Sequence, residues 1–187
     1  MRTYLILLIA VCVYLPFSNT LAQTYFTKDA SISFYSQTPL EEIEALNEKA
    51  VSILNFDENS IQFSVLMKGF HFKNALMQTH FNENYIESDK YPKASFASTA
   101  MDLTNISLTE DGDYVAPVSG ILTVRSKEKE ISTEAIISVN DGKISGKASF
   151  TVSPDDFEIE IPSLVKGKIA KEIEVKVTAN YQLYEKS

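Results

Sequence analysis

The chain has few of the residues on which thiol, metal and nucleotide chemistry depend. Its 187 residues include one cysteine, two histidines, six glycines and no tryptophan. The cysteine, Cys12, lies in an amino-terminal apolar run, so the rest of the chain can form neither disulfides nor zinc–thiolate sites. The glycines form no phosphate-binding motif, which argues against a nucleotide site. The fold must therefore be held together by its apolar core.

The first 22 residues are predicted to be a secretory signal peptide. Arg2 supplies a positive charge, residues 4–17 are apolar and uncharged, and the segment ends in Ala22, a small residue that signal peptidases prefer. The apolar run is shorter than the roughly 20 residues that a membrane-spanning helix needs. We therefore expect cleavage before Gln23 and an exported domain, residues 23–187, that is periplasmic or secreted and does not span a membrane.

The charge balance limits the partners of this domain. The formal net charge of the whole chain is −8, which disfavours nucleic acid and anionic lipid headgroups as surface partners. It does not disfavour an apolar ligand held inside the fold. A domain of this length can bury about 70% of the surface of its unfolded chain, so a large core is feasible. The oligomeric state is left open, and a homodimer is compatible with the sequence.

Alternation of apolar and polar residues dominates the sequence and predicts an all-β domain. Turn signals, such as Asn140-Asp141-Gly142, separate the alternating runs. Because about eight antiparallel strands must hide their edges, we predict a single β-barrel, with a two-sheet sandwich as the alternative. The predicted strands are residues 30–35, 50–56, 60–72, 93–103, 114–125, 129–139, 143–152, 156–161 and 172–184.

Short helices are predicted where the alternation breaks. Residues 38–41, Thr-Pro-Leu-Glu, have the form of a capping box with proline at the first helical position, and predict a helix to about Leu46. Asn74 is a good helix cap and predicts a second helix to about Phe81. A third, near-helical stretch is expected at residues 164–171. The second helix lies in the longest break, residues 70–96, which is predicted to form a flap over the mouth of the barrel.

Three segments have the order and spacing of a known family. They are His80-Phe81 with the Tyr-Pro-Lys-Ala-Ser-Phe of residues 91–96, the Gly-Ile-Leu-Thr within residues 118–124, and residues 150–157, which begin with Phe and end in Asp-Phe. Through them, residues 30–184 resemble the YceI-like family of exported, lipocalin-like barrels that bind polyisoprenoids or other long-chain lipids. The resemblance implies a lipid carrier with an elongated apolar channel inside the barrel.

Large apolar side chains form the candidate ligand-binding set. They come from the flap and from the predicted inward faces of the strands, where small residues such as Gly120, Gly146 and Ala148 leave space unfilled. Phenylalanine and methionine adapt well to flexible apolar ligands. An ordinary packed core is the plainer interpretation of the same residues. The set is Phe63, Met67, Phe70, Leu76, Met77, Phe81, Tyr85, Phe96, Leu122, Phe150 and Phe157.

The sequence shows no constellation suited to catalysis or to a metal. His71 and His80 are nine residues apart, whereas two ligands on one helix need a spacing of three or four. The abundant carboxylates, such as Glu158 and Glu160, alternate with apolar residues as on a half-exposed strand, which favours solvated side chains over a paired-acid hydrolase. No metalloprotease or serine-hydrolase motif occurs. We therefore predict a protein that is not an enzyme and has neither a cofactor nor a metal site.

Two hypotheses follow. The first is an exported binding or transport protein for a long-chain apolar lipid, such as a polyisoprenoid, held inside the barrel. Because arginine is scarce on the predicted inner faces, a neutral or weakly polar headgroup fits better than a pyrophosphate. The alternative is an exported protein–protein interaction module with a solidly packed barrel and an exposed apolar patch. The volume of the barrel interior distinguishes the two.

Overall fold

The computed structural model describes residues 23–184. The predicted signal peptide therefore lies outside the described residues. Eight long strands account for most of the domain, and buried and exposed side chains alternate along them as the sequence predicts. The strands are β1 (Thr24–Gln37), β2 (Glu42–Asn55), β3 (Ser60–Leu66), β5 (Lys93–Met101), β6 (Gly112–Val124), β7 (Lys127–Asn140), β8 (Lys143–Val152) and β9 (Ile173–Leu183).

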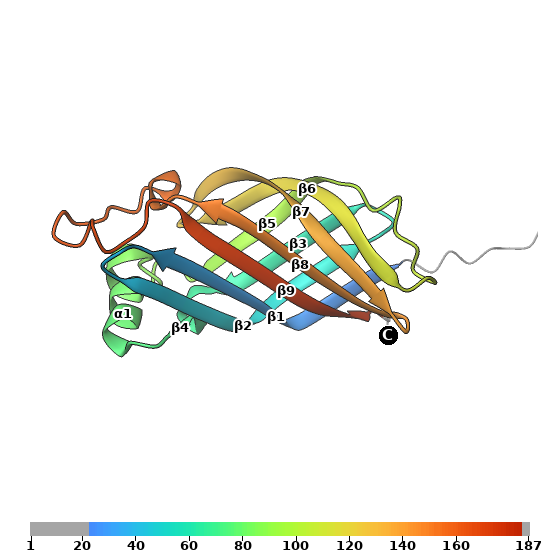
Figure 1. Ribbon diagram of the computed structural model, residues 1–187, viewed down its shortest axis with the longest axis horizontal. Helices are drawn as coiled ribbons and strands as arrows, with labels where there is room; N and C mark the ends of the chain where they lie inside the picture. The colour runs from blue at the N-terminus through green and yellow to red at the C-terminus, as the bar shows by residue number, and fades with distance from the viewer. Residues whose placement is uncertain (1–22, 185–187) are drawn as a thin grey trace, which may run out of the picture.

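The eight strands close into an antiparallel barrel (Figure 1). Their order around the sheet is β1-β9-β8-β7-β6-β5-β3-β2, and pairing between β1 and β2 closes the ring. A short strand, β4 (His71–Phe72), is added to β2 through the pairs Ala45 with Phe72 and Leu46 with His71. The prediction of an all-β barrel is confirmed, and the sandwich alternative is excluded by the closing pair.

The helix predicted from Thr38 is wrong, because this segment is a hairpin turn. β1 ends at Gln37, which pairs with Glu42, the first residue of β2. The Thr38 hydroxyl accepts hydrogen bonds from the backbone N–H groups of Leu40 and Glu41, at 3.2 and 3.0 Å. A threonine that can cap a helix can thus satisfy a turn in the same way. The alternation of the following residues, and the ladder with β1, decide the outcome.

The strand predicted at residues 156–161 is also wrong. Here the chain forms a 3₁₀ turn, η3 (Pro154–Phe157), with a capping box at its start. The Ser153 hydroxyl accepts from the Asp155 N–H, while the Asp156 carboxylate accepts from the Ser153 N–H at 3.0 Å. From η3 the chain continues in an extended loop with a series of turns over residues 163–169, so the near-helical stretch predicted at 164–171 is not a helix.

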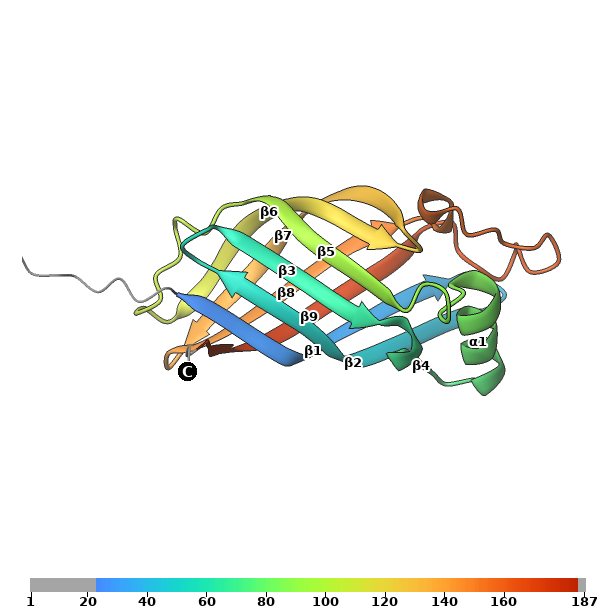
Figure 2. The ribbon, with the colours of Figure 1, turned by 180° about the vertical axis from the view of Figure 1, so that it is seen from behind.

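The predicted flap is present at one end of the barrel (Figure 2). A 3₁₀ turn, η1 (Met67–Gly69), ends the predicted strand 60–72 early, and a helix, α1 (Ala75–His80), follows β4. The Asn74 side chain accepts from the Leu76 N–H at 2.9 Å, which confirms the predicted cap. A wider π-helical turn, η2 (Phe81–Tyr85), extends α1. Among the helices of residues 23–184, none has the length and apolar character needed to cross a bilayer.

Candidate functional site: an apolar cavity in the barrel

A cavity of about 590 Å³ lies inside the barrel. Phenylalanine, isoleucine and valine side chains predominate in its lining, and residues of α1 and of the loop before β9 border it at the flap end. Known small-molecule sites occupy about 300–1,000 Å³ and are largely apolar. The opposite end is packed, because core residues such as Leu54, Val139 and Ile144 are buried and do not border the cavity. The barrel is therefore solid at one end and hollow at the other.

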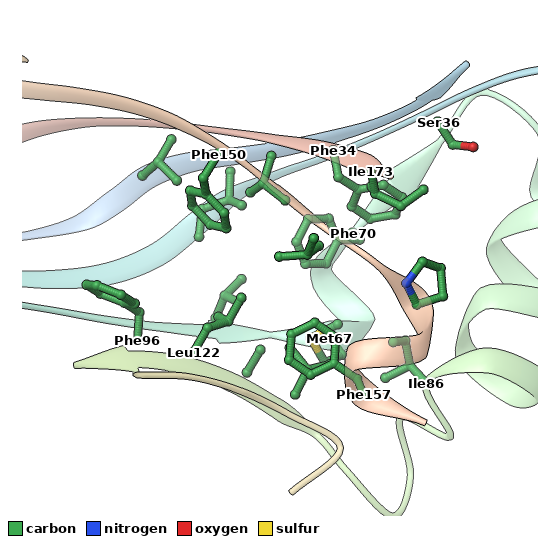
Figure 3. Close-up of a pocket in the computed structure, with 18 of the residues that line it drawn as sticks. Phe34, Ser36, Met67, Phe70, Ile86, Phe96, Leu122, Phe150, Phe157 and Ile173 are labelled. Carbon is green, nitrogen blue, oxygen red and sulfur yellow. The ribbon is translucent and has the colours of Figure 1, made fainter. Parts of the chain in front are cut away.

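All eleven residues of the predicted ligand-binding set border this one cavity. The flap supplies Leu76, Met77, Phe81 and Tyr85. The strands and 3₁₀ turns supply the others, and Figure 3 shows Phe96, Leu122 and Phe150 around the same space. The structure thus brings the set together, and the role of these residues in ligand binding stays a prediction. The remaining members are Phe63, Met67, Phe70 and Phe157.

Two small residues on β8 line the cavity, although a Cβ atom on Gly146 would lie only 3.3 Å from the Ile137 side chain. Gly146 and Ala148 both border it and face the β7 row that contains Ala135. Gly120 serves a different purpose. A Cβ atom there would lie 2.5 Å from the Phe96 ring and 2.4 Å from the Ala97 carbonyl oxygen. Gly120 therefore lets the Phe96 ring lie against β6, and it does not border the cavity.

An aromatic cluster joins the flap to the barrel wall. The ring of Phe34 on β1 lies 5.4 Å from those of Phe70 and Phe81 and 5.7 Å from that of Phe72. Phe81 also packs on Phe72 at 5.0 Å between centroids. Such pairs add about 0.5–1.5 kcal/mol each beyond the area that they bury. Phe34 and Phe72 are absent from the predicted set, although the alternation of β1 already places Ile32 and Phe34 on one face.

A hydrogen-bonded tyrosine lies at the deep end of the cavity. Tyr181 on β9 borders the cavity, and its hydroxyl lies 2.9 Å from the Ser52 hydroxyl. Because the Ser52 hydroxyl donates to the Gln62 carbonyl oxygen at 2.9 Å, the Tyr181 hydroxyl is the donor to Ser52. Burial raises the pKa of Tyr181 above its ordinary value. A neutral phenol therefore closes the cavity floor.

Ionisation of Tyr181 is expected to destabilise the fold in alkaline solution. Since its pKa is raised by burial, the stability is complete below about pH 10 and falls as the pH rises further, by about 1.4 kcal/mol per pH unit until the folded-state pKa is reached. Tyr181→Phe should reduce this slope, because only the smaller contributions of groups such as Tyr25 remain, at a fixed cost of about 1 kcal/mol for the lost hydrogen bond. Urea unfolding on both sides of pH 10 measures it. Equal alkaline loss in the variant and the wild type would contradict the assignment.

Arg125, at the turn between β6 and β7, joins three segments at the rim. Its guanidinium contacts the Glu87 carboxylate at 2.5 Å and the Glu158 carbonyl oxygen at 2.8 Å, and lies 5.6 Å from the centre of the Tyr91 ring. The hydrogen bond from Arg125 lowers the pKa of Glu87. The Arg125 Nε atom is buried and has no hydrogen-bond partner within residues 23–184. No local pattern in the sequence indicates this contact, because its members are far apart along the chain.

Arg125→Met is expected to loosen the flap. Without Arg125 the flap loses its hydrogen bonds from the guanidinium to Glu87 and Glu158, so we expect amide exchange about tenfold faster or more in residues 81–91. Lys127→Met is the matched control, because Lys127 also contacts Glu158, at 2.8 Å, but on the surface, where ion pairs contribute little. Hydrogen–deuterium exchange measures both variants. Equal protection in the two would show that Arg125 does not hold the flap.

The two histidines lie in different surroundings. His80 borders the cavity at the end of α1, whereas the side chain of His71 on β4 is exposed. Within residues 23–184, no group of three or more potential ligands is arranged to hold a metal ion. The charged pair Lys168 and Glu41, 3.6 Å apart, lies at the cavity rim.

The comparisons with known proteins agree with this architecture. The family model described as YceI-like domain matches residues 26–181. No curated protein matches the chain. Three solved structures are similar: a polyisoprenoid binding domain from Saccharophagus degradans implicated in plant cell wall breakdown (TM-score 0.75, 13% identity, 88% of this chain and 100% of that one), BcnA of Burkholderia cenocepacia (0.69, 16%, 82% and 96%), and the YCEI protein of Campylobacter jejuni (0.54, 15%, 68% and 73%). At these identities the likeness concerns the fold. Because the family model matches most of the length of the chain, the chain belongs to the YceI-like family.

Proposed function

We propose that the protein is an exported carrier that binds a long-chain apolar lipid of the polyisoprenoid type inside its barrel. The observation that supports this most strongly is the cavity of about 590 Å³, which opens toward the flap and is closed at its far end. A water molecule occupies roughly 30 Å³ of liquid, so this space far exceeds a packing defect. The name of the Saccharophagus degradans domain, which is that of a polyisoprenoid binding domain, supports the same ligand class.

The energetics favour a long, flexible ligand. Each buried methylene contributes about 0.8 kcal/mol, so about ten of them offer about 8 kcal/mol before the cost of ordering the ligand is subtracted. The lining offers few polar partners, and the cationic Lys168 at the rim is already paired with Glu41. A neutral or weakly polar headgroup therefore fits better than a pyrophosphate. We expect the lining to bind and release its ligand without chemical change.

The proposal includes export. It rests on the predicted signal peptide, residues 1–22, followed by a domain from Gln23 onward that is periplasmic or secreted. The mass of the intact purified protein tests this directly, since cleavage leaves a chain that begins at Gln23.

Native mass spectrometry after gentle purification tests the ligand. We expect an adduct with the mass of an apolar lipid, which organic extraction releases and identifies. Consistent recovery of the empty protein from a lipid-rich host, with no uptake of added polyprenol, would contradict the proposal. The alternative of an interaction module predicts a solidly packed barrel, and the cavity argues against it.

A further inference from the structure

The most exposed large apolar side chain among the described residues lies beside the mouth of the cavity. Leu164 is 92% exposed, in the loop between η3 and β9. This loop projects beyond the barrel at the end that carries α1 (Figures 1 and 2). Leu40, in the turn between β1 and β2, is 71% exposed, and Leu76 on α1 is 61% exposed. Three separate segments thus present leucine side chains to solvent at one end of the molecule.

This apolar rim continues into the cavity. Leu76 borders the cavity, as does Val165, the residue after Leu164. The loop also approaches the β1–β2 turn, because a Cβ atom on Gly167 would lie 3.4 Å from the Leu40 side chain. Exposure of leucine to water is unfavourable relative to its burial. The rim therefore gains most from a partner that is itself apolar.

The positive charge of the loop indicates that the surface of the partner is negatively charged. Residues 161–171 contain Lys166, Lys168 and Lys171 and no acid, although the chain as a whole has a net charge of −8. The Lys168 ammonium lies 3.6 Å from the Glu41 carboxylate, and the acids Glu160 and Glu172 flank the segment. A basic tip on an acidic body orients the molecule with its tip toward negative charge. Apolar residues next to lysines, as in Leu164-Val165-Lys166, also occur in segments that lie in the interface of a bilayer.

We propose that residues 161–171, with Leu40 and Leu76, dock the mouth of the barrel onto a lipid bilayer that contains anionic headgroups. Leu164 enters the interface, and the lysines contact the headgroups. This local surface departs from the expectation, drawn from net charge alone, that anionic lipids are not partners. Docking is separate from the proposed binding of a lipid inside the barrel, because Leu164 does not border the cavity.

Vesicle flotation tests the docking. The protein is mixed with vesicles of phosphatidylcholine alone, or with phosphatidylglycerol added, at low salt. We expect flotation with the mixed vesicles and binding at least about tenfold weaker for Leu164→Asp, since burial of one leucine is worth about 1.5–3 kcal/mol. Val115→Asp is the matched control, because Val115 is 59% exposed on β6, in the wall of the barrel. Replacing the three lysines with glutamine should weaken binding about fivefold per charge.

The outcomes separate docking from cavity binding. Failure of the wild type to float with mixed vesicles would overturn the docking, whatever ligand native mass spectrometry finds. Equal binding to neutral and mixed vesicles would overturn the anionic surface as the partner. Equal binding of Leu164→Asp and Val115→Asp would overturn the loop as the contact. Retention of the co-purified lipid by Leu164→Asp, with flotation lost, would support docking as a separate property of the rim.

A second, independent observation concerns the wall of the barrel. β7 and β8 pair only from Ala135 with Ala148 to Asn140 with Lys143, whereas residues 127–134 of β7 and 149–152 of β8 lack this ladder. Over the same stretches, β7 is fully paired with β6, and β8 with β9. Two side-chain contacts bridge the gap: the Thr133 hydroxyl donates to the Ser149 carbonyl oxygen at 2.8 Å, and Lys129 contacts Asp156 at 2.7 Å.

Side chains alone close this part of the wall. Ile131, Thr133 and Phe150 border the inner cavity and also line a depression on the outside of the barrel. Resting on the proposed lipid binding, we infer that the gap between β7 and β8 is a lateral portal for the apolar chain. Its opening breaks few hydrogen bonds, whereas the neighbouring seams, β6–β7 and β8–β9, have complete ladders over the same stretches.

Covalent closure tests the portal. The cysteine pair Ser132→Cys and Thr151→Cys continues the register across the gap, and Ser138→Cys with Ser145→Cys is the control within the intact ladder. Residues 23–187 contain no other cysteine. Each pair is closed by oxidation or by a short bismaleimide, and uptake of a fluorescent polyprenol is timed. We expect uptake at least about tenfold slower across the closed gap and unchanged in the control. Equal rates would overturn the portal, whereas absence of uptake in every protein would refute lipid binding itself.

Discussion

Ala148→Trp is expected to abolish lipid binding and to leave the barrel folded. Ala148 lies on the inward face of β8, opposite Ala135 on β7 and Val177 on β9, and all three border the cavity. An indole at this position has open space in front of it, so it fills the cavity and does not displace packed neighbours. Burial of the apolar surface of the indole offsets the rotamer freedom that the tryptophan side chain loses. We expect binding of a polyprenol to fall by about 100-fold or more, with no loss of stability, because the methylenes that the indole displaces are worth about 0.8 kcal/mol each.

Ile136→Trp is the matched control. Ile136 is exposed on the outer face of β7, so its indole points to solvent and should leave binding unchanged. Because the natural chain has no tryptophan, the fluorescence of each variant comes from the introduced indole alone and reports its surroundings. The emission of Ala148→Trp should be blue-shifted, because its indole is buried. The emission of Ile136→Trp should be that of an indole in water. Retained binding in a folded Ala148→Trp variant with blue-shifted emission would show that the ligand lies elsewhere.

Most of the fold could be predicted because the barrel repeats one local rule. On β7 and β8 every second residue faces inward, and the sequence alternates accordingly, so the prediction for 143–152 coincides with β8. The Asn140-Asp141-Gly142 turn between them carries positive φ at Asp141 and Gly142, which these residue types accommodate readily. Where local pattern and long-range pairing agree, the sequence is sufficient.

The errors arise where a short motif has two structural uses. Thr38 caps a turn as well as it caps a helix, and only the ladder between β1 and β2 decides between them. Residues 156–161 alternate like a strand, but Pro154 lacks the N–H that a central strand needs and the Ser153–Asp156 capping box ends β8. The ladder between β1 and β2 determined the first outcome, and the proline with the capping box determined the second.

The candidate site likewise contains some residues that could be predicted from the sequence and others that could not. The inward apolar residues could be predicted from alternation and from the family resemblance, and all of them border one cavity. Arg125 could not, because its partners Glu87 and Glu158 lie 38 and 33 residues away. The Tyr181–Ser52 contact spans 129 residues. Polar contacts of this kind depend on the closure of the barrel, so the structure is needed to find them.

Two leucines are expected to separate the stability of the barrel from its binding. Leu54, at the packed end, is 0% exposed, pairs with Tyr25 and Ile61, and does not border the cavity. Its truncation to alanine leaves a void that rigid neighbours cannot fill, at a cost of about 3–5 kcal/mol in the free energy of unfolding. Leu122, at the hollow end, already borders open space. Because it gives up few contacts, Leu122→Ala should cost only about 1–2 kcal/mol.

The effects on lipid binding should be reversed, because the ligand supplies the contacts that Leu122 lacks in the empty protein. A buried leucine contact is worth about 1.5–3 kcal/mol, so Leu122→Ala should weaken polyprenol binding by about tenfold or more, while folded Leu54→Ala binds like the wild type. Urea unfolding and titration with a fluorescent polyprenol measure the two quantities on the same samples. Equal destabilisation by both substitutions would mean that the barrel is packed throughout, and the cavity could then not be the binding site.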